Sequence, residues 1–321
     1  IQDNKDALYI YQQRSTTNTY NGIIAATKVA DYLNGNIKKH EHTITSRQEM
    51  FKDYLGTTGF NADPVLLSYQ KEDSINTILS KYQENRAEYE FTTTNKSLHK
   101  LWVIHDSTDI DIVTNAFKNI NSLYIADGHH RCASSALLSE SNNTEKSKYF
   151  MSFLIAEDQL NIINFNRLVK GLNNLSVNEF LQKLNSKFKV NETSNCNASN
   201  KDDIGMYLDG RCFLLTAKKD SYINDCVNRL DPAILSNNIL APILNITDEK
   251  TDKNISFEAG TTPLSLIKRK VDNREFTVAF ILKPIPFSAI KEVADKNRFM
   301  PPKSTYIEPK LRSGLTIYTL D

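Results

Sequence analysis

The stretch YIADGHHRCASSALL, residues 124–138, places an Asp, a Gly, two His and an Arg between an apolar run and a helical pattern. The apolar residues 123–126 predict a strand, Asp127 and Gly128 predict a turn, and a helix is expected to start near His129. The first amides of such a helix have no partners inside it, so they point at solvent or at a ligand. Together with the helix dipole, which is roughly half a positive charge at this end, they predict an anion site suited to phosphate.

The residue types in this turn fit a nucleotide. Gly128 allows a close backbone approach that a Cβ would obstruct, and Arg131 supplies a planar fork of donors for phosphate oxygens. The Asp127 carboxylate beside the same phosphates would hold Mg²⁺ directly or through water. The alternative is structural: Asp127 caps the helix, Gly128 makes the turn, and His129 and His130 are half exposed.

Length and charge narrow the class of protein. A chain of 321 residues fits about two domains. The net charge of +1 does not favour nucleic acid or an anionic membrane as a partner, so a small-molecule substrate is expected. The sequence has neither a run of 18 or more apolar residues nor a signal peptide, and its four scattered cysteines suggest reduced thiols. We therefore expect a cytoplasmic protein. Since the chain begins at Ile1, a preceding segment is expected to be missing.

The order of patterns predicts an α/β to α+β protein. Apolar β-rich runs alternate with segments of helical period in the first half. In the second half, residues 149–155 and 160–165 suggest a hairpin, Ser176 opens a helix with a capping box, and a polar loop follows. The predicted elements are strands at 8–11, 65–69, 101–104, 123–126, 276–282 and 315–320, helices at 74–84 and 108–120 and after Asp231, and the loop at 191–203.

A second polar cluster is NIKKHEHT, residues 36–43. Glu41, flanked by His40 and His42, is a candidate general base beside an anion site. In an extended segment the two histidines share one face and Glu41 takes the other. The alternative is a solvated, charged loop.

The third cluster is MPPKSTYIEPKLRSG, residues 300–314. Its prolines stiffen a loop that is rich in hydrogen-bonding groups. Lys303, Ser304 and Lys310 are candidate ligands for a substrate carboxylate on the basis of their donor chemistry. The alternative is a rigid linker followed by a turn.

Four motifs in this order, IKKHEHT, YIADGHHR, LAPILNI with TDKNISF, and MPPKSTYIEPKLRSGL, resemble the prokaryotic family called domain of unknown function ten-fifteen. That family is distantly similar to the ParB and sulfiredoxin superfamily, in which a G-x-x-R turn binds nucleotide phosphates. The superfamily includes free-serine kinases with a similar D-G-H-x-R turn and a catalytic glutamate. The resemblance implies that Gly128, His129, His130 and Arg131 bind the nucleotide and Asp127 the metal. It also implies that Glu41, Asp127 and His129 are catalytic.

These observations predict a ParB-like, nucleotide-binding domain at residues 1–145 and an α+β region at residues 146–321. The predicted function is a kinase that uses ATP or ADP with Mg²⁺ to phosphorylate the hydroxyl of a small molecule such as free L-serine. One alternative is a metal-dependent hydrolase that uses the histidines and Asp127 to hold Zn²⁺ or Fe²⁺. Another is a non-catalytic nucleotide-binding ParB-like module. A homo-oligomer is compatible with all three functions.

Overall fold

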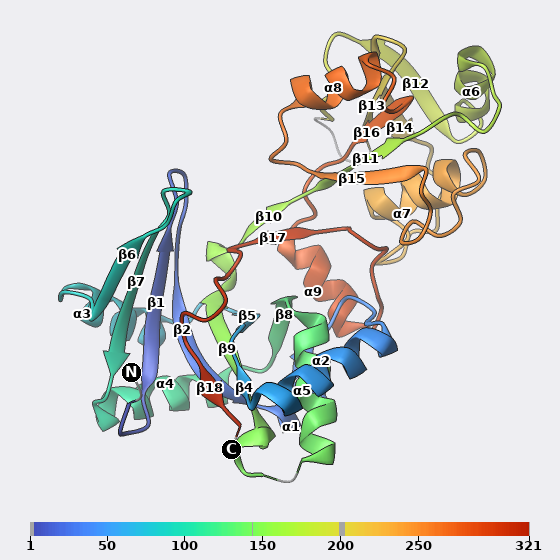
Figure 1. The fold of residues 1–321 in the computed structure, drawn as a ribbon. Coiled ribbons are helices and arrows are strands. Elements are labelled where there is room, and N and C mark those ends of the chain that lie inside the picture. Colours follow the sequence, from blue (N-terminus) through green and yellow to red (C-terminus); the bar gives the residue numbers. More distant parts are fainter. Residues whose placement is uncertain (1–2, 143, 199–202, 321) are drawn as a thin grey trace. The chain divides into compact units, whose positions relative to one another are not determined.

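The computed structural model describes residues 3–142, 144–198 and 203–320, and the chain forms two compact units (Figure 1). Unit 1 comprises Ile1–Asn161 and Ile307–Asp321, and unit 2 comprises Ile162–Tyr306. This division differs from the predicted boundary at residues 145/146. The reason is that residues 149–156 lie inside the sheet of unit 1 and the end of the chain returns to that unit.

Unit 1 is built on an eight-stranded mixed sheet in the order β3-β8-β5-β9-β2-β1-β7-β6. β3 is parallel to β8 and β5 is parallel to β9, whereas the other neighbours are antiparallel. Its strands are β1 Leu8–Arg14, β2 Thr19–Lys28, β3 Ile37–Lys38, β5 Val65–Tyr69, β6 Tyr89–Thr92, β7 Leu98–Ile104, β8 Leu123–Asp127 and β9 Tyr149–Ala156. This confirms a mixed α/β unit, and a ParB or sulfiredoxin topology stays a prediction.

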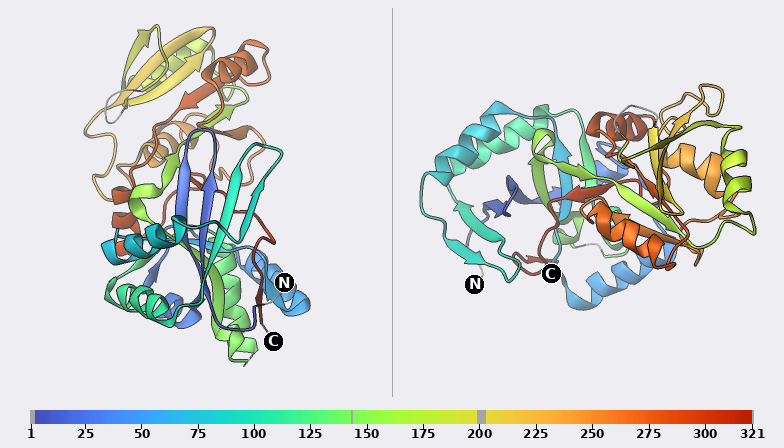
Figure 2. Two further views of the ribbon diagram at one scale, coloured as in Figure 1. Left: turned by 90° about the vertical axis from the view of Figure 1, so that its left-hand side faces the viewer. Right: turned by 90° about the horizontal axis from the view of Figure 1, so that it is seen from above.

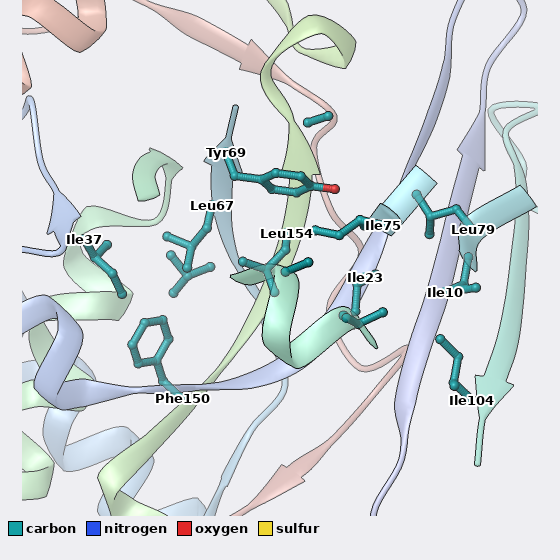
Figure 3. Packing of buried hydrophobic residues seen from close by; sticks show 14 of the residues in the cluster. Ile10, Ile23, Ile37, Leu67, Tyr69, Ile75, Leu79, Ile104, Phe150 and Leu154 are labelled. Carbon is teal, nitrogen blue, oxygen red and sulfur yellow. The ribbon is translucent and has the colours of Figure 1, made fainter. Parts of the chain in front are cut away.

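Helices cover one face of this sheet and enclose the core (Figure 3). Alternate residues of the strands, such as Ile23 of β2 and Leu67 of β5, belong to one buried cluster with Ile75 and Leu79 of α3. Figure 2 shows α3 and α4 together on one side of the sheet. The helices of unit 1 are α1 Val29–Leu33, α2 Thr45–Thr58, α3 Asp73–Gln83, α4 Ser107–Asn119 and α5 His129–Ser141, with short 3-10 turns at Lys146–Lys148 and Glu157–Gln159.

The returning end of the chain, residues 307–320, crosses the other face, and we call it the C-terminal strap. Thr316 lies 3.2 Å from the Met151 sulfur, and Met151 points away from the helices because it alternates with the core residue Phe150. The Gly314 amide donates to the Ala62 carbonyl at 2.8 Å. The strap ends in β18 (Tyr318–Thr319), which pairs with β4 (Phe60–Asn61).

Unit 2 is an antiparallel six-stranded sheet in the order β12-β14-β13-β16-β11-β15. Its two faces bury separate clusters, one beside α6 and α7 and the other beside α8. The elements are β11 Phe165–Val169, α6 Val177–Leu184, β12 Phe188–Thr193, β13 Asp203–Leu208, β14 Arg211–Ala217, α7 Asp231–Leu235, a π-helix at Ser236–Leu240, β15 Ile255–Ala259, α8 Leu264–Asp272, β16 Val278–Ile281 and α9 Phe287–Asp295. The short strands β10 (Asn161–Ile163) and β17 (Tyr306–Glu308) contain the two points where the chain passes between the units.

Local patterns predicted most of these elements. The two amphipathic helices, the strand at 65–69 and the capping box at Ser176 are confirmed. The predicted hairpin is wrong, because β9 pairs with β5 and β2 and Phe165 begins a strand of the other sheet. Part of the predicted loop at 191–203 belongs to β12, and residues 199–202 lie outside the described part of the chain. Among the described helices, none is both long and apolar enough to cross a membrane.

The prediction of four reduced cysteines is wrong for one pair. Cys196 and Cys212 form a disulfide with their Cα atoms 4.9 Å apart, because β12 pairs with β14 and brings Thr193 opposite Cys212. Cys132 and Cys226 are buried free thiols. The expectation of a cytoplasmic location rested partly on reduced thiols and stays a prediction.

Unit 2 contains a buried ion pair between Arg167 and Glu249. Arg167 on β11 is fully buried, with its Nε 3.6 Å from Glu249 Oε2. Its Nη1 and Nη2 donate to the carbonyls of Phe165 and Pro302. Burial lowers the pKa of Arg167 to about 10. The guanidinium therefore joins the start of β11 to the loop that precedes β17.

Removing one partner should be costly. We expect Glu249→Ala to lower the free energy of unfolding by about 3–5 kcal/mol, because it leaves a buried cation without its anion. The Arg167→Met, Glu249→Leu double variant should lose less than Glu249→Ala alone. Urea denaturation measures both, with the exposed Glu145→Ala as control. A Glu249→Ala loss no larger than that of the control would contradict the pair's role.

Candidate functional site

The candidate site lies at the end of two adjacent parallel strands. β3 pairs with β8 in parallel register, Ile37 opposite Leu123 and Lys38 opposite Tyr124. The carboxyl ends of both strands therefore reach the same edge of the sheet, where α/β proteins place their ligands. Residues 39–44, which follow β3 and which we call the 39–44 loop, thus come beside the turn that follows β8.

The turn after β8 has the geometry that the sequence predicts. Gly128 precedes α5 with φ at 98°, in the left-handed region that a residue with a Cβ rarely adopts. The first bond within the helix runs from the Cys132 amide to the Gly128 carbonyl, at 2.9 Å. The helix's own bonds therefore do not use the amides of residues 129–131, which lie at its positive end.

Arg131 folds back over this turn. A Cβ on Gly128 would lie 2.9 Å from the Arg131 guanidinium nitrogens. Arg131 Nη2 donates to Asp127 Oδ2 at 2.8 Å, and Nη1 donates to the Pro64 carbonyl at 2.5 Å. The guanidinium is thus fixed beside the helix N-terminus, and about a quarter of the side chain (26 %) stays exposed. The guanidinium N–H groups that Asp127 and Pro64 do not use can donate to an anion there.

Asp127 also receives a cation from the C-terminal strap. Lys310 Nζ donates to Asp127 Oδ1 at 2.9 Å. The strap is held on both sides of Lys310: Glu308 accepts from Asn161 at 2.8 Å, and the Gly314 amide donates to Ala62. The two oxygens of Asp127 therefore face two different cations, and Arg131 and Lys310 together outweigh the negative charge of Asp127.

The 39–44 loop is joined to α5 through the rings of His129 and His130, the two histidines of the DGHHR motif. The His40 amide lies 3.5 Å from His129 Nε2, and the Ile44 amide donates to His130 Nε2 at 3.1 Å. Glu41 lies between these two anchor points, with its Oε2 3.7 Å from His129 Nδ1. Its side chain is 40 % exposed, so a substrate hydroxyl can reach it.

Two of the histidines are buried and uncharged. His40 and His129 pack edge to face with ring centroids 4.6 Å apart. Burial lowers the pKa of His40 to about 4. Burial, followed by the effect of the nearby His40, His130, Lys39 and Arg131, holds the pKa of His129 well below its usual range. His129 therefore contributes its backbone amide to the helix end, while its ring faces the 39–44 loop.

Three further candidate residues, Lys303, Ser304 and His42, have surroundings of their own. Lys303 and Ser304 belong to unit 2. The Ser304 hydroxyl is buried and donates to the Pro301 carbonyl at 2.7 Å, and Lys303 Nζ lies 5.5 Å from the centre of the Phe165 ring. His42 is exposed in the 39–44 loop. Of the three proposed substrate ligands, the structure of unit 1 brings only Lys310 to the turn.

The histidine and carboxylate pool does not form a metal centre. In the described parts of the chain, no group of three or more His, Cys, Asp or Glu side chains is arranged to hold a metal ion. The metal-dependent hydrolase therefore lacks its ligand set. Mg²⁺ has a lower requirement, since one or two carboxylates and the substrate phosphates suffice. Asp127 can be the carboxylate ligand of Mg²⁺ only if a bound nucleotide becomes the partner of the cations that now bind Asp127.

Some parts of the site carry no sequence signal. The Pro64 carbonyl binds Arg131, but nothing in its residue type indicates this. His40 belongs to the motif HEH, whose exposed appearance gives no sign that its ring is 1 % exposed. The pairing of β5 with β8, which sets Leu66 opposite Asp127, brings Pro64 to the turn, and the parallel pairing of β3 with β8 brings His40 there.

Solved structures are similar to this chain over most of its length. SbnI with C-terminal truncation from Staphylococcus aureus is 15 % identical, with a TM-score of 0.50 over 92 % of this chain and 87 % of that one, which indicates a shared fold. A free serine kinase in complex with AMP is 12 % identical, with a TM-score of 0.45 over 89 % and 87 %. A conserved hypothetical protein from Pyrococcus furiosus is 13 % identical, with a TM-score of 0.44 over 90 % and 93 %.

No curated protein matches the chain. A family model does match it, over residues 1–233, which is more than half of the 321 residues and includes the turn, the 39–44 loop and β11. Two of the four motifs quoted above, IKKHEHT and YIADGHHR, lie inside the matched residues, and the chain belongs to the family described as protein of unknown function (DUF1015).

Proposed function

We propose that the protein is a nucleotide-dependent kinase that uses ATP or ADP with Mg²⁺ to phosphorylate the hydroxyl of a small molecule such as free L-serine. The observation that carries the proposal is the turn at Gly128, where a positive φ, the helix N-terminus and the Arg131 guanidinium meet. Such donors converge where phosphates bind. The resemblance of D-G-H-x-R to the turn of free-serine kinases adds the reaction class.

The geometry of the turn supports the proposed phosphate contacts. The amides at the start of α5 would bind the phosphate oxygens, and Arg131 would bind them with the face of its fork that Asp127 and Pro64 leave open. The Lys310 ammonium group would move from Asp127 to the same phosphates. Its side chain is 41 % exposed and lies on the C-terminal strap. In phosphoryl transfer such positioning and neutralisation supply most of the catalysis.

Asp127 would hold the metal of the metal-nucleotide complex. When bound, Mg²⁺ would supply positive charge that stabilises the phosphoryl group being transferred. Asp127 Oδ1 would be available to hold the metal once Lys310 binds the phosphates, and Oδ2 would keep its hydrogen bond to Arg131.

Glu41 would accept or orient the proton of the acceptor hydroxyl. It is exposed, it lies on the loop beside the turn, and its position is fixed from both sides by backbone contacts to His129 and His130. Lys303 and Ser304 remain candidates for the acceptor carboxylate on their donor chemistry. The position of Lys310 beside Asp127 supports a phosphate contact for that residue.

Nucleotide binding should depend on Arg131. Isothermal titration of ADP and of ATP, each with Mg²⁺, should give micromolar binding to the wild-type protein. Arg131→Ala should weaken it at least tenfold, since a hydrogen bond to a charged group contributes about 1.5–3 kcal/mol. The exposed Arg86→Ala is the matched control and should bind as the wild type does. Absence of binding to the wild-type protein at any workable concentration would overturn the proposal.

Turnover should depend on Glu41. With L-serine as the first acceptor tested, Glu41→Gln should lower kcat by about 10²–10⁴-fold, the usual contribution of a general base, while the nucleotide Kd stays close to that of the wild type. Phosphoserine formation, measured by ³¹P NMR, gives kcat. A Glu41→Gln variant with full turnover would exclude Glu41 as the base, and nucleotide binding without phosphorylation of any hydroxyl compound would favour a non-catalytic module.

A further inference from the structure

His129 lies where it can act on Glu41 and not on the nucleotide. Its ring is 5 % exposed and packs against His40. Its Nδ1 faces Glu41 Oε2 at 3.7 Å, and its Nε2 faces the His40 amide at 3.5 Å. The two ring nitrogens therefore meet two groups of opposite character, a carboxylate and an N–H donor.

These neighbours select one tautomer of the neutral ring. A proton on Nε2 would point at the His40 N–H and set two donors against each other, whereas a bare Nε2 accepts from it. The single proton then belongs on Nδ1, where it faces the carboxylate of Glu41. The 3.5 Å separation is long for a hydrogen bond, but the direction of the two dipoles still distinguishes the tautomers.

With its proton on Nδ1, the His129 ring is a hydrogen-bond donor that carries no charge. The carboxylate oxygen that faces this nitrogen is Glu41 Oε2, at 3.7 Å. An uncharged donor beside Glu41 orients the carboxylate without neutralising it.

We infer that His129 is a positioning residue for Glu41: its Nδ1–H orients the carboxylate toward the acceptor hydroxyl, and the His40 backbone amide fixes the tautomer that makes this possible. The inference rests on the proposed function, in which Glu41 is the base. It assigns the histidine ring of the D-G-H-x-R turn to the acceptor side of the reaction. The nucleotide meets only the backbone of that residue.

The tautomer can be measured without any turnover. In protein labelled with ¹⁵N-histidine, the His129 signals, assigned by their loss in His129→Asn, should show a protonated Nδ1 and a bare Nε2 at pH 7. Glu41→Gln should shift the Nδ1 signal more than the Nε2 signal. A proton on Nε2, or an imidazolium ring at pH 7, would overturn the inference even in a protein that phosphorylates its substrate.

Two variants that differ only in where they place a donor test the role in catalysis. The amide nitrogen of Asn overlays Nδ1 of histidine, and that of Gln overlays Nε2. His129→Gln should lower kcat on the order of 100-fold, the cost of displacing a catalytic group by about 1 Å. His129→Asn should recover most of that loss, and the nucleotide Kd should change little in both.

Equal loss in the two variants would identify a purely structural ring and overturn the inference, as would a smaller loss in His129→Gln than in His129→Asn. Thermal unfolding of both variants shows whether either fails to fold, and in that case the tautomer in the wild-type protein decides. Failure of the proposed function is distinct, because it appears as absent turnover in the wild type while the Nδ1–H tautomer persists.

Discussion

Gly128 can hold φ at 98° because it has no Cβ, and the arrangement of charge around the turn depends on this. Gly128 is the single residue between the end of β8 and the start of α5. The N-terminus of α5 therefore lies directly at the edge of the sheet. It also leaves room for Arg131 to lie across the backbone, where a Cβ would approach its guanidinium to 2.9 Å. Without this residue the guanidinium and the helix amides would not face the same point.

Around that point the structure places exposed charged groups beside buried neutral ones. Arg131 and Lys310 occupy the two oxygens of Asp127 on the exposed side. His40 and His129 are buried and neutral on the other side, where they support the loop that carries Glu41. An anion is therefore attracted to one side of the turn and a hydroxyl group can approach the base on the other. This division suits the proposed kinase, which has to bring a phosphate donor to a hydroxyl acceptor.

The sequence predicted the local parts of this arrangement and missed the distant ones. The strand ending near residue 126 and the helix start at His129 follow from an apolar run, a glycine and a change of period, all within one short segment. The contact of Lys310 with Asp127 spans 183 residues, and no local pattern encodes it. β2 was missed although it lies in the middle of the sheet, since its polar ends obscure the apolar residues Ile23 and Ile24. The disulfide was missed because it depends on how β12 pairs with β14, and no local pattern encodes that pairing.

A crystal structure of the protein grown with ADP and Mg²⁺ tests the central claim most directly. The account predicts that the phosphates lie against the amides at the start of α5, in contact with Arg131, and that Lys310 has left Asp127 for a phosphate oxygen. A nucleotide bound elsewhere, for example in the cavity of about 520 Å³ in unit 2 that Arg229 and Lys283 help to line, would contradict it. So would a nucleotide at the turn with its phosphates directed away from α5.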